Sequence, residues 1–165
     1  MNRTLQMAVG ICAGLASASV VAEECENGAG AKSAVGSYLS AMQEHRFKDA
    51  FEFVTETMTD GRVKDEWAGM QKLFYQGGEV NIFGIDIRVP QADENDPDCT
   101  IRAIVPNVLK SRDKFNNQGI TEFEIYTVAK DGDTWKVDMQ ETLFDQPEVD
   151  KWFPGEKLEE FRDAY

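Results

Sequence analysis

The cysteines are the residues whose type and spacing bear most directly on chemistry. Cys12 lies in an uncharged N-terminal segment, and Cys25 and Cys99 lie in the rest of the chain. Two cysteines in an exported chain favour a disulfide that closes a long loop; the alternative is a pair of free thiols. Neither residue belongs to a Cys-x-x-Cys pair, so the sequence argues against a redox enzyme.

Metal-binding and nucleophilic patterns are weak in this chain. His45 is the only histidine and has no second His or Cys at ligand spacing, so we expect it to be structural or exposed. The acidic run 93–98 and the turn 131–133 both lack the Gly and Glu positions of a helix–loop–helix calcium loop. No Ser–His–acid arrangement follows from the spacing. We therefore expect no metal and no cofactor.

The spacing of apolar residues along the chain changes midway, from the period of a helix to that of a strand. In the first half, apolar residues at helical spacing predict helices over 33–43, 47–58 and 63–76. The third helix is expected to end at Gly77-Gly78 and to bury one apolar face, made of Val63, Trp67, Met70, Leu73 and Phe74.

Alternating apolar and polar residues predict strands in the second half of the chain. They cover 81–89, 99–109, 121–128 and 134–140, with an Asp-Gly turn at Asp131-Gly132 between the last two. Pro106 suggests that its strand is an edge strand or carries a bulge. A short helix is expected near 156–161.

This order of elements predicts an α+β fold, with N-terminal helices packed on a curved antiparallel sheet and a short C-terminal helix. We expect one domain over residues 32–142, preceded by a flexible lead at 23–31. An acidic C-terminal extension, which carries the short helix, follows over 143–165.

Composition restricts the function classes. The chain has 165 residues, of which 42% are hydrophobic, and this is enough apolar material for one core. Its formal net charge is −13, which argues against nucleic-acid binding because phosphate contacts require an excess of Lys and Arg.

The N-terminal segment has the pattern of a secretory signal. A single positive charge at Arg3 is followed by a short, uncharged stretch of apolar and small residues up to Ala22. We expect cleavage after Ala22, with Ala18 as the competing site, and a periplasmic or secreted mature chain without a membrane span. Ile11 before Cys12 argues against lipidation. The alternative is an N-terminal membrane anchor that stays attached.

The chain resembles the NTF2-like superfamily (SnoaL-like, cystatin-like α+β cone), in particular its small exported members. The resemblance rests on the helix 34–41 with its continuation to 51, and on the last hairpin over 128–137. It implies a bent sheet that wraps a long helix and leaves an apolar pocket at its open end. Members include isomerases, dehydratases and epoxide hydrolases, and also proteins without catalysis, so the fold leaves the function open.

The resemblance also supplies weak catalytic candidates. Tyr38 sits where a steroid-isomerase-like member has its oxyanion donor, but it also lies on the apolar stripe of its helix. No aspartate clearly matches the base. An epoxide-hydrolase-like site would place Arg102 between two aspartates, here Asp86 and Asp138, although the alternation of their strands favours a solvated sheet face. A buried acid with an Arg, His or Tyr partner would be the mark of an enzyme.

We expect a non-catalytic exported domain that binds a small apolar ligand or a protein partner in the cell envelope. The alternatives are a cone-fold enzyme of isomerase, dehydratase or epoxide-hydrolase type acting on a lipophilic substrate, and a homodimeric interaction module that pairs through the open face of its sheet. The rings expected to line the ligand pocket are Tyr38, Phe51, Trp67, Phe74, Phe83, Phe123 and Trp135.

Overall fold

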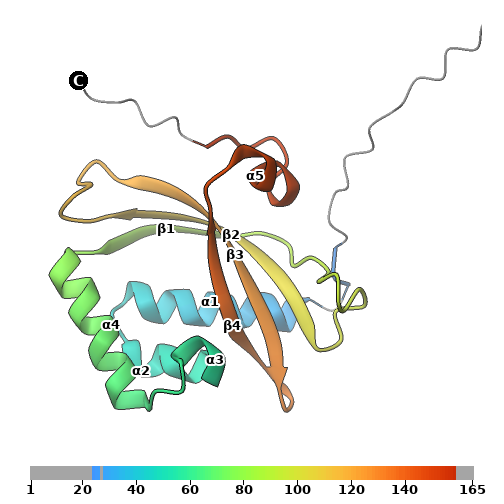
Figure 1. Cartoon of the computed structure of the whole chain (residues 1–165), viewed down its shortest axis with the longest axis horizontal. Coiled ribbons are helices and arrows are strands. Elements are labelled where there is room, and N and C mark those ends of the chain that lie inside the picture. Colours follow the sequence, from blue (N-terminus) through green and yellow to red (C-terminus); the bar gives the residue numbers. More distant parts are fainter. Residues whose placement is uncertain (1–23, 27, 159–165) are drawn as a thin grey trace, which may run out of the picture.

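The computed structural model describes residues 24–26 and 28–158 (Figure 1). The helical part comprises α1 (Ala29–Gln43), α2 (Phe47–Ala50), the 3-10 helix η1 (Phe51–Phe53), α3 (Glu56–Thr59) and α4 (Lys64–Gly78). The strands β1 (Asn81–Ile87), β2 (Arg102–Arg112), β3 (Ile120–Asp131) and β4 (Thr134–Leu143) follow, and then α5 (Gln146–Trp152). The predicted fold class is confirmed, since helices pack against an antiparallel sheet and a short C-terminal helix follows.

The sheet has the strand order β1-β2-β3-β4, with each strand antiparallel to its neighbour. Its strands curve around α1, which crosses the inner face, whereas α5 lies on the outer face (Figure 1). Alternate residues of each strand point to opposite faces. Both faces of the central strands are therefore covered, and polar residues there lack the solvated side that the sequence suggested.

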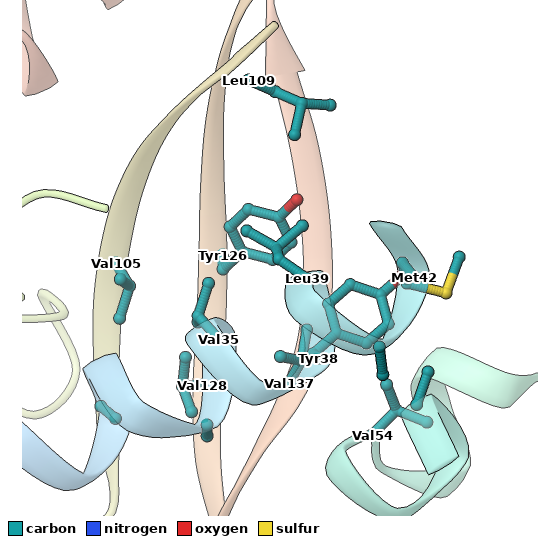
Figure 2. Close-up of a cluster of buried hydrophobic side chains, with 14 of the residues drawn as sticks. Val35, Tyr38, Leu39, Met42, Val54, Val105, Leu109, Tyr126, Val128 and Val137 are labelled. Atoms are coloured by element: carbon teal, nitrogen blue, oxygen red, sulfur yellow. The ribbon is translucent and has the colours of Figure 1, made fainter. Parts of the chain in front are cut away.

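α1 buries the stripe that its spacing predicts. Val35, Tyr38, Leu39 and Met42 pack against Val105, Tyr126 and Val128 of the sheet (Figure 2). At the start of the helix, the backbone of Gly30 touches the indole of Trp135, and a Cβ there would lie 2.5 Å from the ring. The helix can therefore approach β4 closely at that point.

The second predicted helix is wrong as one continuous element. It is divided into α2, η1 and α3, because the chain becomes extended at Val54 and joins the sheet beside β4. Val54 pairs with Val137 in a parallel bridge, and the backbone N–H of Thr55 donates to Val137 O at 2.9 Å. The side chain of Thr55 then accepts from the backbone N–H of Met58 and caps α3.

α4 does not bury the apolar face predicted for it. Trp67 is buried and packs edge-to-face on Phe51, with ring centroids 5.8 Å apart. In contrast, Leu73 is 70% exposed and Phe74 is 62% exposed. The helix stands at the end of the sheet where β1 begins, and it packs mainly against α2 and η1 (Figure 1). Only one side of its apolar stripe therefore has a neighbour.

Pro106 lies in an inner strand rather than at an edge or a bulge. Its carbonyl accepts from the backbone N–H of Arg88, just beyond the end of β1. Regular pairing of β1 with β2 stops at Ile87, and the neighbouring chain pairs again only at Gln91. The proline thus lacks its N–H at the place where the neighbouring strand is interrupted, so no ladder hydrogen bond is lost.

The C-terminal helix lies earlier than predicted. α5 begins after Asp145, whose side chain accepts from the backbone N–H of Glu148, and it ends at Trp152. Residues 156–158 are not helical, and 159–161 lie outside the described residues. Val149 and Phe153 pack with Val108, Phe123 and Leu143 in a second hydrophobic cluster. The helix therefore covers the outer face of the sheet.

The segment before α1 is packed, which differs from the flexible lead expected at 23–31. Glu24 pairs with Gln91, and the backbone N–H of Cys25 donates to Pro90 O at 2.9 Å. Cys25 and Cys99 form the predicted disulfide, with a Cα–Cα distance of 5.8 Å. The expected signal peptide lies outside the described residues. Over the part of the chain that the structure covers, each helix is too short or too polar to cross a bilayer.

Replacing Cys25 and Cys99 with serine should destabilise the domain. The bridge links residues 74 apart, and in the chain-entropy model a loop of that length contributes about 4 kcal/mol. We expect urea unfolding of the double variant to show a loss of that order, and we expect reductant to lower the stability of the wild-type protein alone. Equal unfolding free energies of the two proteins would contradict a structural role for the bridge.

Candidate functional site

A glutamate is buried on the inner face of β3. Glu124 is 2% exposed and lies opposite Asn107 in the pairing of β2 with β3. The side-chain amide of Asn107 donates to Glu124 Oε2 at 3.1 Å, and the hydroxyl of Tyr126 donates to the same oxygen at 2.7 Å. The amide of Gln140, on β4, donates to Oε1 at 2.7 Å. Residues from three strands therefore converge on one carboxyl group.

Burial dominates the electrostatics of this group. It raises the pKa of Glu124, because a charged carboxylate loses its hydration inside the protein. The donors Tyr126, Asn107 and Gln140 oppose that rise, whereas the negative charge of Glu122 adds to it. The net direction is upward, so the protonated carboxyl is favoured relative to that of an exposed glutamate.

Tyrosines from three elements surround Glu124. Tyr38 comes from α1, Tyr75 from α4 and Tyr126 from β3, and the rings of Tyr38 and Tyr126 meet edge-to-face at 6.2 Å (Figure 2). Burial raises the pKa of all three, that of Tyr75 to about 12, and the nearby charge of Glu124 contributes in each case. All three hydroxyls therefore remain protonated at neutral pH.

Beside this carboxyl, one buried polar atom has no hydrogen-bond partner among the described residues. Asn107 is fully buried, and its carbonyl oxygen accepts no hydrogen bond. The hydroxyls of Tyr38 and Tyr75 likewise make none with any described residue, although Tyr38 is only 5% exposed. Buried polar atoms normally have partners, so the Asn107 oxygen is free to bind a water or a ligand. We call Glu124, Asn107, Tyr126, Gln140 and Tyr38 the inner polar cluster.

The sequence analysis missed Glu124. It lies in an alternating run with Glu122, which indicated a solvated face on the polar side of β3. The signal that could have identified it is Tyr126, a ring on the same face as the two glutamates. The position of α5 supplies the rest, because α5 covers Phe123 on the outer face and leaves Glu124 facing α1.

The three residues of the epoxide-hydrolase hypothesis do not all converge. Arg102 lies 3.6 Å from Asp138, but Asp86 pairs with Arg88 at 3.1 Å instead. The other carboxylate beside Arg102 belongs to Asp93, at 3.5 Å. An arginine does therefore lie between two aspartates, but one of them was not a candidate.

These contacts also order the loop that leads into β2. Asp96 accepts from the backbone N–H groups of Ile101 and Arg102, at 2.7 and 2.8 Å, and the bond from Ile101 is the largest cause that lowers the pKa of Asp96 to about 2. Asp93 accepts from the backbone N–H of Asn95 at 2.8 Å. Thr55 donates to Asp138 at 2.7 Å and ties the loop cluster to α3. This is the pattern of a structural network.

The rings expected to line one pocket are distributed over the molecule. Tyr38, Phe51 and Trp67 belong to the inner core, and Trp135 packs at the start of α1. Phe123 lies on the outer face, where its ring centroid is 5.0 Å from that of Phe153. Phe74 and Phe83 are largely exposed, and the guanidinium of Arg112 lies over the ring of Phe83. Of the expected set, only Tyr38 reaches the inner polar cluster.

His45 is exposed and packs against aromatic rings. Its ring stacks on Phe47 at 5.6 Å and meets Tyr75 edge-on at 5.5 Å. Among residues 24–26 and 28–158, no group of three or more His, Cys, Asp or Glu side chains is arranged to hold a metal ion.

No protein-family model and no curated protein matches the chain. Among solved structures, a ketosteroid isomerase-like protein from Erwinia carotovora is 17% identical, with a TM-score of 0.49, and 70% of this chain aligns with 93% of that one. A domain of unknown function with a cystatin-like fold from Nostoc punctiforme is 11% identical, with a TM-score of 0.49, over 67% of this chain and 72% of that one.

A third solved structure is Bd1075 from Bdellovibrio bacteriovorus, which is 14% identical, with a TM-score of 0.47 over 66% of this chain. The aligned region spans only 38% of the Bd1075 chain. At these TM-scores the comparisons carry no argument about function, which is therefore argued from the inner polar cluster.

Replacing Glu124 with Gln should change how stability depends on pH. Because burial raises the pKa of Glu124, the folded protein keeps this proton to a higher pH than the unfolded chain does, and stability falls as pH rises through that range. In urea unfolding from about pH 4.5 to 7.5, we expect the wild-type protein to lose stability relative to the variant.

The matched control is Glu141→Gln, which changes an exposed glutamate of β4. Its stability should follow that of the wild-type protein at each pH. Parallel curves for the wild-type protein and Glu124→Gln would contradict an elevated pKa at Glu124.

Proposed function

We propose that this protein is an exported, non-catalytic domain that binds a small, largely apolar molecule at the inner polar cluster. The ligand would place a hydrogen-bonding group against Glu124 and Tyr38 and its apolar part against the buried side chains of α1 and β2. Among these are Leu39, Met42 and Leu109, which lie around the two tyrosine rings (Figure 2).

The observation that carries the proposal is the buried carboxyl group of Glu124, which lies beside the unpaired carbonyl oxygen of Asn107. Moving a carboxylate out of water costs several kcal/mol unless its partners compensate, and an apolar residue at this position would serve folding better. Perturbed titratable groups of this kind concentrate at functional sites. The groups that a ligand would satisfy are the buried, unpaired oxygen of Asn107 and the Tyr38 hydroxyl, which bonds to no described residue.

Export is supported by the disulfide between Cys25 and Cys99, because such bonds persist in oxidising compartments. The N-terminal pattern of one basic residue, a short apolar stretch and a small-residue site after Ala22 supports it independently. Together they support a ligand met in the envelope or outside the cell.

A cone-fold enzyme is the second candidate, and one specific observation favours it. Glu124 is a buried acid with a tyrosine partner, which the sequence analysis named as the mark of catalysis. Its raised pKa suits a general acid or base. We prefer binding because both oxygens of Glu124 already accept hydrogen bonds from the protein's own side chains.

Dimerisation through the outer face of the sheet has less support. α5 occupies part of that face, with Val149 and Phe153 packed on Phe123. A protein partner would also meet the exposed side chains of the surface before it reached Glu124. A small molecule therefore fits the inner polar cluster better than a second protein does.

Titration with 1-naphthalenemethanol, a neutral aromatic alcohol that reports binding by its fluorescence, tests the proposal. We expect saturable binding at one site per chain with a Kd of roughly 10–100 µM, which is typical of a ligand of this size. Tyr38→Phe removes one hydroxyl and should weaken binding about 2- to 10-fold. Absence of saturable binding by the wild-type protein would end the proposal.

Glu52→Gln serves as the control, since Glu52 lies in η1 on the surface and pairs there with Lys64. It should bind the alcohol as the wild-type protein does. If Glu52→Gln and Tyr38→Phe weakened binding equally, the alcohol would not be bound at the inner polar cluster.

A further inference from the structure

Within residues 24–26 and 28–158, the carboxyl group of Glu124 has hydrogen-bond donors but no cationic partner. Its donors are a phenol and two amides, all uncharged. Each Arg–carboxylate and Lys–carboxylate ion pair within the described residues involves some other acid. The like charge of Glu122 acts on Glu124 and raises its pKa further. A buried carboxylate of this kind has its hydrogen bonds, but no positive charge balances its negative charge.

The unpaired atom beside this carboxyl is also an acceptor. Asn107 directs its NH₂ group to Glu124, and its carbonyl oxygen is left buried without a donor. The hydroxyl of Tyr38, which is unpaired as well, can accept as readily as it donates. The carboxyl group of Glu124, the amide oxygen of Asn107 and the phenol of Tyr38 therefore present mainly acceptors, so a complementary ligand group must be rich in donors.

One donor to Glu124 is replaceable. Asn107 and Tyr126 are fully buried, whereas Gln140 is exposed on the edge strand β4. Its amide reaches Oε1 at 2.7 Å from the solvent side. A ligand donor approaching from solvent can take the place of this amide without disturbing the two buried hydrogen bonds on Oε2.

The surroundings suit a cation attached to an apolar body. The rings of Tyr38 and Tyr126 present π faces and edges near the carboxyl, and cations are attracted to such faces. Leu39, Met42 and Leu109 supply buried apolar surface on the same side of the sheet (Figure 2). An anionic ligand would instead meet Glu124 and Glu122 without a countercharge.

Building on the proposed function, we infer that the ligand is a small apolar amine, bound as its ammonium ion. One N–H of the ammonium replaces the Gln140 amide at Glu124 Oε1, and the neighbouring acceptors of Asn107 and Tyr38 receive the others. The apolar body of the amine packs against α1 and β2.

Three probes of matched size distinguish amine binding from the binding of any small apolar molecule. They are 1-naphthylmethylamine, 1-naphthalenemethanol and 1-naphthoate, titrated against the purified protein at pH 7 by fluorescence and calorimetry. We expect the amine to bind about tenfold more tightly than the alcohol, because charge-assisted hydrogen bonds are roughly twice as strong as neutral ones. We expect no measurable binding of the carboxylate.

Two variants test whether Glu124 causes the preference for the amine over the alcohol. Glu124→Gln keeps the size of the side chain and removes its charge, and the exposed Gln140 amide can turn its oxygen toward the new NH₂ group. It should reduce amine binding about tenfold while changing alcohol binding by less than about threefold. Gln140→Ala removes the competing amide and should bind the amine at least as tightly as the wild-type protein. Glu141→Gln, which changes an exposed acid on the same strand, should change neither affinity. Circular dichroism establishes that each variant is folded.

The outcomes separate the two proposals. Alcohol binding without a preference for the amine, or tighter binding of the carboxylate, would overturn the amine inference and leave the proposed function standing. A preference that survives in Glu124→Gln would also overturn it, since the charge would then be recognised elsewhere. Failure of all three probes to bind would overturn both proposals.

Discussion

The carboxyl group of Glu124 lies on the inner face of a sheet that is apolar over most of its surface, and the elements around it are arranged to hold it there. β2 supplies Asn107, β3 supplies Tyr126 and β4 supplies Gln140, each at hydrogen-bond distance. α1 closes the face with Tyr38, and α5 covers the opposite face, which fixes the side to which Glu124 points. Oε2 has two donors, whereas Oε1 depends on Gln140 of β4. A buried acceptor that loses its donor costs more than the hydrogen bond alone.

Local patterns were sufficient to predict the fold class. The helical stripe of α1 and the Asp-Gly turn between the last two strands depend on short-range spacing, and both are where the sequence places them. The prediction of one long second helix was wrong because Val54 is drawn into the sheet by a bridge to Val137. The neighbouring contact of Thr55 with Asp138 likewise joins residues 83 positions apart. Helical spacing cannot represent a tertiary contact of that kind.

The site was harder to predict than the fold for a related reason. Alternation along β3 separates its two faces but does not say which face is covered, and here both are. Glu124 therefore has the same sequence signature as a solvated glutamate. The pairing of Arg102 with Asp93 depends on the folded loop that leads into β2, whose turns are set by hydrogen bonds of Asp96. By contrast, the pairing of Cys25 with Cys99 needs only the count of cysteines in an exported chain, and it is found.

The same feature that makes the buried acid unfavourable for folding makes it suitable for binding a cation. An interior that lacks a countercharge for Glu124 raises the pKa of that group and also creates the electrostatic demand that a cationic ligand would meet. The exposed position of Gln140 gives such a ligand a way to reach the carboxyl, while the disulfide and the packed lead keep the opposite end of α1 fixed.

The most direct measurement is a ¹³C NMR titration of the Glu124 side-chain carboxyl, with and without 1-naphthylmethylamine. The account predicts a midpoint above the ordinary glutamate range in the free protein, and a downward shift of that midpoint when the amine is bound, because the ammonium stabilises the charged carboxylate. An ordinary midpoint that does not respond to the amine would contradict it.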